Sequence, residues 1–152
     1  LHPLLDSVNV VNAPLIAKKR GIDVREVKRD QAEDYQTLIR LTIITERQQR
    51  SIAGTLIAGD KPRIVEIKGI KIEAELSPHM LYFTNNDKPG LIGGIGLVLG
   101  AAEVNIATFN LGRVAAGGDA IGLISVDSDV SEEVLNQLRG IPNIIQVKAL
   151  RF

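Results

Sequence analysis

The sequence contains no cysteine, and this absence excludes disulfides, thiolate zinc sites and a cysteine nucleophile. Aromatic residues make up only 3% of the chain, so a core must be built from Ile, Leu, Val and Ala. The chain also has no excess of either charge, because 18 basic residues balance 18 acidic ones. No global field therefore recruits nucleic acid, a membrane or a polyanionic partner.

Long apolar runs are missing as well. The longest mostly apolar segment runs from Leu91 to Ala102 and is interrupted by glycines, so it falls short of the roughly 18 residues that a membrane span requires. We expect a cytoplasmic protein with no membrane and no nucleic acid partner. The chain does not begin with Met, and we expect it to be a fragment of a longer protein.

The beginning of the chain reads like the middle of a domain. A strand-like stretch at Asn9 to Asn12 precedes a helix from about Ala13 to Arg20. Pro14 fits the first turn of this helix and Gly21 fits its end. Residues 1–77 are therefore predicted to form part of a small α+β domain whose partner strands are expected upstream.

The rest of this first half has the pattern of an antiparallel sheet. Gln36 to Thr45 is rich in β-branched residues and predicts a strand. Three further short strands follow, with turns at Gly59-Asp60 and Lys68-Gly69. We place a domain boundary at Ser77-Pro78, where the strand pattern stops and restarts.

Residues 78–152 predict a second domain with the order βαββαβ. This order is the ferredoxin-like pattern, in which two helices cover one face of a four-stranded antiparallel sheet. Apolar residues at helical spacing give the first helix one continuous face, with Asp87 as its cap and Pro89 in its first turn. The expected strands are Met80–Asn85, Val104–Arg113, Ala120–Asp127 and Asn143–Leu150. The apolar face of the first helix consists of Leu91, Ile92, Ile95, Val98, Leu99 and Ala102. Asp129, followed by Glu132, is expected to begin the second helix.

The stretch GIGLVLG, from Gly94 to Gly100, resembles a dinucleotide-binding loop but has one residue more than the usual fingerprint. A dinucleotide fold would need a crossover helix after the second strand, whereas this strand turns straight back through Gly117-Gly118. We therefore expect no cofactor in this chain, and we interpret Gly93, Gly94 and Gly96 as sites of close helix packing.

The corner NNDKPG suggests a different ligand. Asn85, Asp87 and the backbone N–H groups of Gly90 and Leu91 meet at a helix N-terminus, which favours a carboxylate, while Asp87 can accept from an ammonium. Asn105 adds a further amide at the start of the next strand. Together these groups match a free amino acid. The alternative remains open that Asp87 is a plain cap and the asparagines are turn residues.

The run NDKPGLIGGIGLVLGAAEVNIATFNLGR resembles the ACT domain, an amino-acid-sensing module, and VNVVNAPLIAKKRGIDVREVK resembles the intervening, or allosteric substrate-binding, domain of long-form D-3-phosphoglycerate dehydrogenase. The pair of modules implies the C-terminal regulatory part of that enzyme family. It implies feedback inhibition by L-serine bound at a two-fold ACT interface, a homodimer, and upstream catalytic domains that carry NAD. By this resemblance, the serine-binding positions of the family correspond to Asn85, Asp87 and Asn105. Some members of the family have His or Tyr at the position of Asn85.

Other sites and functions are weaker. Lys61, Arg63 and Lys68 are candidates for an anion site, although interspersed acidic residues favour a solvated charged face. His79 has no carboxylate patterned nearby, and the two histidines have no metal-ligand spacing. An acyl-phosphate hydrolase would need an Arg where the corner has Lys88, and an RNA-binding sheet would need paired aromatics. A dimerisation module without a ligand is the main alternative.

Overall fold

The computed structural model describes residues 8, 9, 11–28, 35 and 37–152. The chain divides into two compact units, Leu1–Glu33 and Asp34–Phe152. Helix α1, Ala13–Lys19, belongs to the first unit, and all of the strands and the other two helices belong to the second.

Helix α1 begins at the predicted residue and ends one residue before the predicted Arg20, with proline in its first turn and Gly21, at φ 70°, shortly after its end. The prediction of a strand at Asn9 to Asn12 is wrong, because none of the described residues in this stretch is in a strand; Val10 lies outside the described residues. The side-chain oxygen Oδ1 of Asn9 accepts hydrogen bonds from the backbone N–H groups of Val11 and Asn12, each at 3.0 Å. This Asn-centred turn leads into the helix, because a short amide side chain competes with strand hydrogen bonding.

The first sheet is a meander of four antiparallel strands, as predicted. Its strands are β1 (Ile39–Ile44), β2 (Gln49–Ile57), β3 (Lys61–Ile67) and β4 (Ile70–Glu75), and each pairs with the next. The last two turns contain consecutive residues with positive φ, Ala58-Gly59 and Lys68-Gly69, as expected of tight hairpins.

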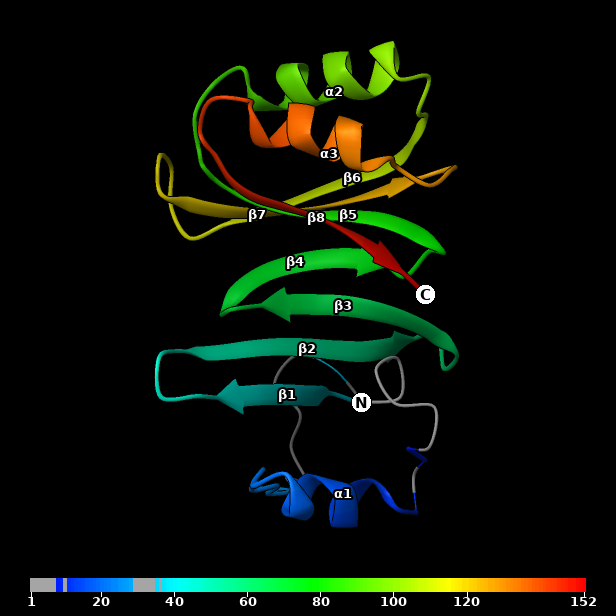
Figure 1. The fold of residues 1–152 in the computed structure, drawn as a ribbon, viewed down its shortest axis with the longest axis vertical. Helices are drawn as coiled ribbons and strands as arrows, with labels where there is room; N and C mark the ends of the chain where they lie inside the picture. Colours follow the sequence, from blue (N-terminus) through cyan, green and yellow to red (C-terminus); the bar gives the residue numbers. More distant parts are fainter. Residues whose placement is uncertain (1–7, 10, 29–34, 36) are drawn as a thin grey trace. The chain divides into compact units, whose positions relative to one another are not determined.

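The second sheet has the order β6-β7-β5-β8 and is antiparallel throughout. Helices α2 and α3 lie on one face of it (Figure 1). The chain order of these elements is βαββαβ, so the predicted α+β class and ferredoxin-like order are confirmed. The elements are β5 (His79–Asn86), α2 (Leu91–Ala101), β6 (Ile106–Arg113), β7 (Asp119–Val126), α3 (Glu132–Arg139) and β8 (Ile144–Arg151).

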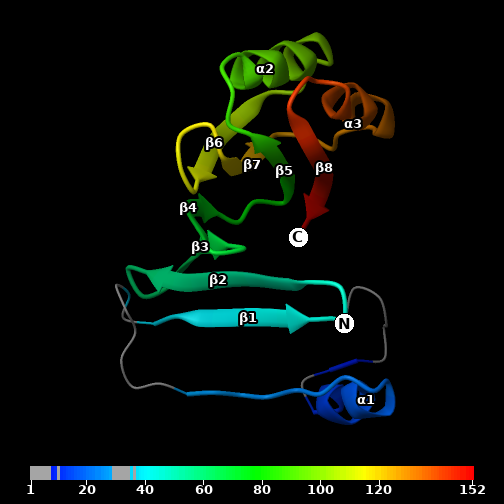
Figure 2. The ribbon, with the colours of Figure 1, turned by 90° about the vertical axis from the view of Figure 1, so that its left-hand side faces the viewer.

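Each face of the second sheet buries its own apolar cluster. On the helix side, Leu81 and Phe83 of β5 pack with Ile95 and Leu99 of α2 and Leu138 of α3. On the other face, isoleucines of β3 and β4 pack against β5 and β7, and Figure 2 shows β4 on the side away from the helices. The second cluster consists of Ile64, Ile67, Ile70, Ile72, Ala74, Met80, Ile121 and Leu123. The two sheets of this unit therefore share a core.

Both helix caps differ from prediction. Helix α2 begins after Gly90, which has φ 91°, so Asp87 and Pro89 precede the helix, and no side chain among the described residues caps it. Helix α3 is capped by Ser131, whose Oγ accepts from the N–H of Val134 at 3.3 Å, rather than by Asp129. Ser131 lies immediately before the first helical residue, where a short hydroxyl reaches the free N–H groups.

The predicted apolar face of α2 is only partly buried. Leu91, Ile95 and Leu99 are buried, but Ile92 is 55% exposed. The predicted domain boundary at Ser77-Pro78 falls between β4 and β5 and stays a prediction. Among the described residues, none of the helices has both the length and the apolar character that crossing a membrane requires.

Candidate functional site

Asn85 lies near the end of β5, the central strand pairing with both β7 and β8. Its side chain is fully buried. The amide nitrogen Nδ2 donates to the carbonyl of Asn86 at 3.0 Å, whereas the oxygen Oδ1 is buried without a partner in the described part of the chain. An unpaired buried acceptor costs about 1–3 kcal/mol, which makes Asn85 an unusual feature at the base of the corner.

Asp87 is held by the β6–β7 hairpin. Its Oδ2 accepts from Nη1 of Arg113 at 2.7 Å and from the N–H of Gly117 at 3.2 Å. Its own N–H donates to the carbonyl of Gly118 at 2.8 Å. The corner after β5 is therefore tied to both ends of the hairpin turn by three hydrogen bonds.

The carboxylate of Asp87 stays ionised. Its pKa is lowered from the ordinary 3.8, first because Arg113 donates to it and second because Gly117 does, while partial burial acts in the opposite direction. The positive charge of Lys88 lowers the pKa further. At neutral pH the site therefore contains a fixed negative charge.

The N-terminus of α2 lies three residues beyond Asp87. Gly90, exposed, precedes this helix as its N-cap residue, and Leu91, buried, is its first residue; in the described part of the chain no side chain caps it. These groups have no partner within the helix and favour an anion. Asp87 and the α2 N-terminus thus present an acceptor for an ammonium and donors for a carboxylate.

Asn105 lies at the opposite end of the same sheet. Asn85 pairs with Ala120 of β7, whereas Ile106 pairs with Val126 at the other end of that strand. At ~3.3 Å per residue, the two ends are about 20 Å apart. The Nδ2 of Asn105 donates to Oδ2 of Asp127 at 2.7 Å. Within one chain the structure does not bring Asn105 together with Asn85 and Asp87.

The glycines of the GIGLVLG stretch lie inside α2 rather than in a loop before it. Their N–H groups are used in helical hydrogen bonding and form no phosphate cradle. A Cβ on Gly94 would lie 3.2 Å from Ile141, so this glycine permits the expected close packing of α2 beside α3. Gly93 and Gly96 face open space, and the packing role predicted for them is wrong within a single chain.

The three candidates for an anion site do not converge. Lys61 begins β3 and Lys68 follows its last residue, which places them about 20 Å apart. Lys68 lies with its Nζ 5.9 Å from the ring centre of Tyr82. Arg63 donates from Nη1 to Oε2 of Glu75 at 2.6 Å.

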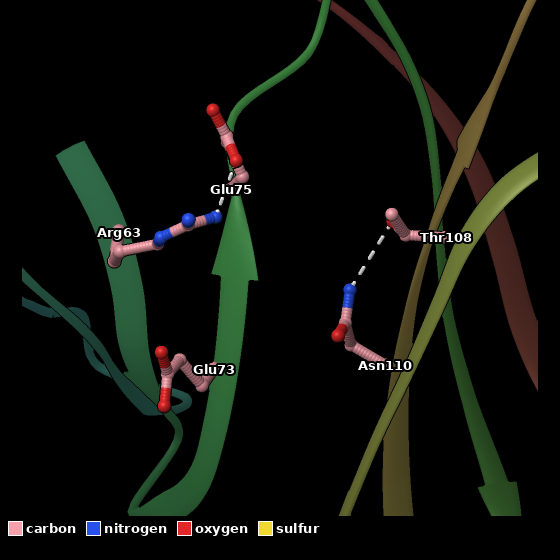
Figure 3. Close-up of a pocket in the computed structure, with 5 residues that line it drawn as sticks. All are labelled: Arg63, Glu73, Glu75, Thr108 and Asn110. Carbon is pink, nitrogen blue, oxygen red and sulfur yellow. Dashed lines mark hydrogen bonds and ion pairs between the residues drawn. The ribbon is translucent and has the colours of Figure 1, made fainter. Parts of the chain in front are cut away.

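Arg63 lines a cleft of about 390 Å³ between β4 and β6 (Figure 3). The other residues that line it are Glu73, Glu75, Thr108 and Asn110. Two carboxylates against one guanidinium give this cleft a net negative charge, which opposes the binding of an anion. The predicted anion site therefore stays a prediction without support from the arrangement of its side chains.

His79 does have a carboxylate beside it, contrary to the expectation from the sequence. Its Nδ1 lies 2.8 Å from Oδ1 of Asp129, and the same oxygen accepts from Nε of Arg151 at 2.9 Å. These residues tie the start of β5 to the end of β8 and to the segment before α3. In the described part of the chain, no three His, Cys, Asp or Glu side chains gather closely enough to hold a metal ion.

Arg113, Gly117 and Asp127 were not recognised as site residues in the sequence. Arg113 and Gly117 follow Asp87 by 26 and 30 residues, and Asp127 follows Asn105 by 22. The one usable signal was the predicted hairpin through Gly117-Gly118. Because β5 and β6 both pair antiparallel with β7, they run parallel to each other, so the last residues of β5 and of β6 lie at the same end of the sheet.

The first part of the chain matches a known family model. Residues 1–68 match the D-3-phosphoglycerate dehydrogenase intervening domain. This match covers α1 and β1 to β3 and ends within the turn before β4.

Similarity to whole proteins extends further along the chain. The D-3-phosphoglycerate dehydrogenase of Bacillus subtilis is 35% identical over 151 residues, which are 99% of this chain and 29% of that enzyme. The enzyme of the same name from Methanocaldococcus jannaschii is 35% identical over 149 residues, 98% of this chain and 28% of its own length. The probable L-serine dehydratase beta chain of Bacillus subtilis is 30% identical over 132 residues, 87% of this chain and 60% of its own.

The chain spans less than a third of the length of the two dehydrogenases. It is therefore similar to only one part of each enzyme. The predicted resemblance is confirmed: residues 1–68 match the intervening domain of D-3-phosphoglycerate dehydrogenase, and nearly the whole chain is similar to a small part of that enzyme.

Proposed function

We propose that this chain is an amino-acid-sensing regulatory region, with L-serine as its ligand, in a D-3-phosphoglycerate dehydrogenase of serine biosynthesis. The observation that carries the proposal is Asp87, ionised and held in place beside the uncapped N-terminus of α2. An ammonium matches the carboxylate, and the ligand's carboxylate matches the free N–H groups. The names of the relatives favour L-serine, because one of them is named as the beta chain of a probable L-serine dehydratase.

The separation of Asn105 from Asp87 supports a site shared by two copies. Strand β6 is an edge of the second sheet. Antiparallel pairing of two β6 strands about a two-fold axis at Phe109 would place Asn105 of each copy opposite Arg113 of the other. Each of the two sites would then combine Asn85 and Asp87 of one copy with Asn105 of its neighbour.

Helix α2 offers a second surface for the same contact. It lies over the β6 side of the sheet, whereas α3 covers β8 (Figure 2). Ile92 and Leu97 are 55% and 77% exposed, and a Cβ on Gly93, Gly96 or Gly100 would meet no neighbour. These five residues share one side of the helix at spacings of three and four. An apolar side with glycines allows another helix to approach closely.

The regulatory mechanism is a population shift. Serine bound between two copies stabilises that arrangement, and by linkage the catalytic domains of the whole enzyme move toward less productive states. We propose that this region performs no chemistry itself and that NAD binds elsewhere in the complete enzyme. Its partners are then L-serine, a second copy and the catalytic domains.

Calorimetric titration with L-serine tests the proposal directly. We expect saturable binding that glycine and D-serine do not reproduce. Asn105→Ala should weaken binding by roughly 1–3 kcal/mol, because one ligand hydrogen bond is lost while the fold is kept. Asn136→Ala, on the exposed side of α3, is the matched control and should leave the affinity unchanged. Equal affinities for the wild type and Asn105→Ala would remove Asn105 from the site.

The proposed dimer can be tested on the open side of α2. Leu97→Glu would place a charge in the apolar contact and should raise the dimer dissociation constant at least about tenfold. Ile145→Glu is the control, because Ile145 is 62% exposed on β8 at the opposite edge. Sedimentation velocity over a range of concentrations measures both. If the two variants dissociate equally, α2 and β6 do not form the interface.

The second candidate is a dimerisation module without a small ligand. The edge strand β6 and the open side of α2 favour it as much as they favour the serine site. A folded dimer that binds no amino acid would support this alternative.

A further inference from the structure

Arg113 has donors that its ion pair does not use. Its Nη1 donates to Asp87 at 2.7 Å, yet its side chain is 56% exposed, against 20% for Asp87. A guanidinium carries five N–H donors in a fixed planar fork, a geometry that fits a carboxylate. The exposed part of Arg113 therefore faces solvent with its charge only partly engaged.

We propose that Arg113, together with the free N–H groups at the start of α2, binds the carboxylate of an α-amino acid whose ammonium is held by Asp87. This inference rests on the proposed function and adds a specificity-determining residue to its site. A zwitterionic amino acid carries its two charges on groups joined to one carbon atom. The Asp87–Arg113 pair holds the complementary charges side by side, so one small ligand can meet both.

The pair is positioned before any ligand arrives. Arg113 is the last residue of β6 and pairs with Ala120 of β7, so its backbone is fixed by the sheet. Gly117, at φ 76° in the connecting turn, donates to the same oxygen of Asp87. The Oδ1 oxygen of Asp87 has no hydrogen-bond partner among the residues that the structure describes. This arrangement leaves one carboxylate oxygen for an ammonium and reduces the ordering that binding requires.

A purely structural role for Arg113 predicts the opposite effect on binding. If Arg113 only neutralises Asp87, its removal would free a negative charge for the ligand ammonium and would strengthen binding. If Arg113 holds the ligand carboxylate, its removal weakens binding, and only for ligands with that carboxylate. The sign of the change therefore separates the two roles.

The experiment is calorimetric titration of the 152-residue chain with L-serine and with L-serinamide, which keeps the ammonium but has a neutral amide. The wild type should prefer L-serine. Arg113→Gln should weaken L-serine binding about 10- to 100-fold and change L-serinamide binding little, so the preference is lost. Arg113→Lys, which keeps the charge without the planar fork, should be intermediate.

Lys88→Gln is the matched control, because it removes one positive charge from the residue next to Asp87. It should keep the preference for L-serine. Unchanged or tighter L-serine binding by both Arg113 variants, with the wild type binding normally, would overturn the role of Arg113 and leave the proposed function intact. A wild type that binds no amino acid would overturn both. Circular dichroism melting of each variant identifies any that fail to fold, and Arg113→Lys then decides.

Discussion

Alanine in place of Gly112 is expected to lower the free energy of unfolding by about 3 kcal/mol. Gly112 lies on β6 where β4 crosses closely. A Cβ there would overlap the backbone carbonyl oxygen of Lys71 and lie 2.9 Å from Cγ2 of Ile70. A backbone atom of a paired strand cannot rotate away, so β4 has to move off the second sheet and the shared apolar cluster opens.

Urea unfolding followed by circular dichroism measures this loss. Asn136→Ala is the control, because Asn136 is exposed on α3, away from the proposed interface, and its effect should lie within the range of ordinary surface substitutions. Hydrogen exchange should be faster in β3 and β4 of the Gly112 variant than in the wild type. A change below about 0.5 kcal/mol, within the range of ordinary surface substitutions, would show that β4 does not approach β6 this closely.

Gly122→Ala should have a similarly large effect in the other core. Gly122 pairs with Phe83 across β7 and β5, and the ring of Phe83 lies directly over it. A Cβ at position 122 would overlap this ring and lie 2.8 Å from its Cε2. Phe83 is 1% exposed and its ring centre lies 5.8 Å from that of Phe109, so the ring has no free space to move into. We expect a loss of about 3 kcal/mol from this overpacking.

A double-mutant cycle identifies the cause. Phe83→Leu removes the outer ring atoms and should destabilise the chain by itself, because it leaves a cavity. In the background of Gly122→Ala it should destabilise much less, since the added methyl group fills part of that space. Strictly additive losses of unfolding free energy would mean that the ring does not rest on Gly122.

The sequence was sufficient for the order of the elements because that information is local. Apolar and charged residues alternate strictly in Ile70–Glu75, and this alternation with the turn residues before it predicts a strand. The structure shows the matching alternation of buried and exposed side chains. The helix caps were harder to predict from the sequence. Asp87 has the right chemistry for a cap, but Gly90 determines where α2 begins, and contacts distant in sequence recruit the carboxylate instead.

The residue types of the candidate site could be proposed from the sequence, but their arrangement could not. Asn85, Asp87 and Asn105 could each be recognised from a short motif. Their grouping could not, because the length of a strand separates Asn105 from the other two. The pairing of His79 with Asp129 bridges 50 residues and depends on the fold, which no local pattern encodes.

The order β6-β7-β5-β8 also bears on when the second sheet can form during synthesis. Strand β5 is made first among its four strands, yet β8, the last of them, covers one of its edges. Until Ile144–Arg151 leaves the ribosome, that edge of β5 has no partner and can pair with other chains. A nascent chain paused after α3 should therefore be the form most in need of chaperones, and slower translation before β8 should increase aggregation.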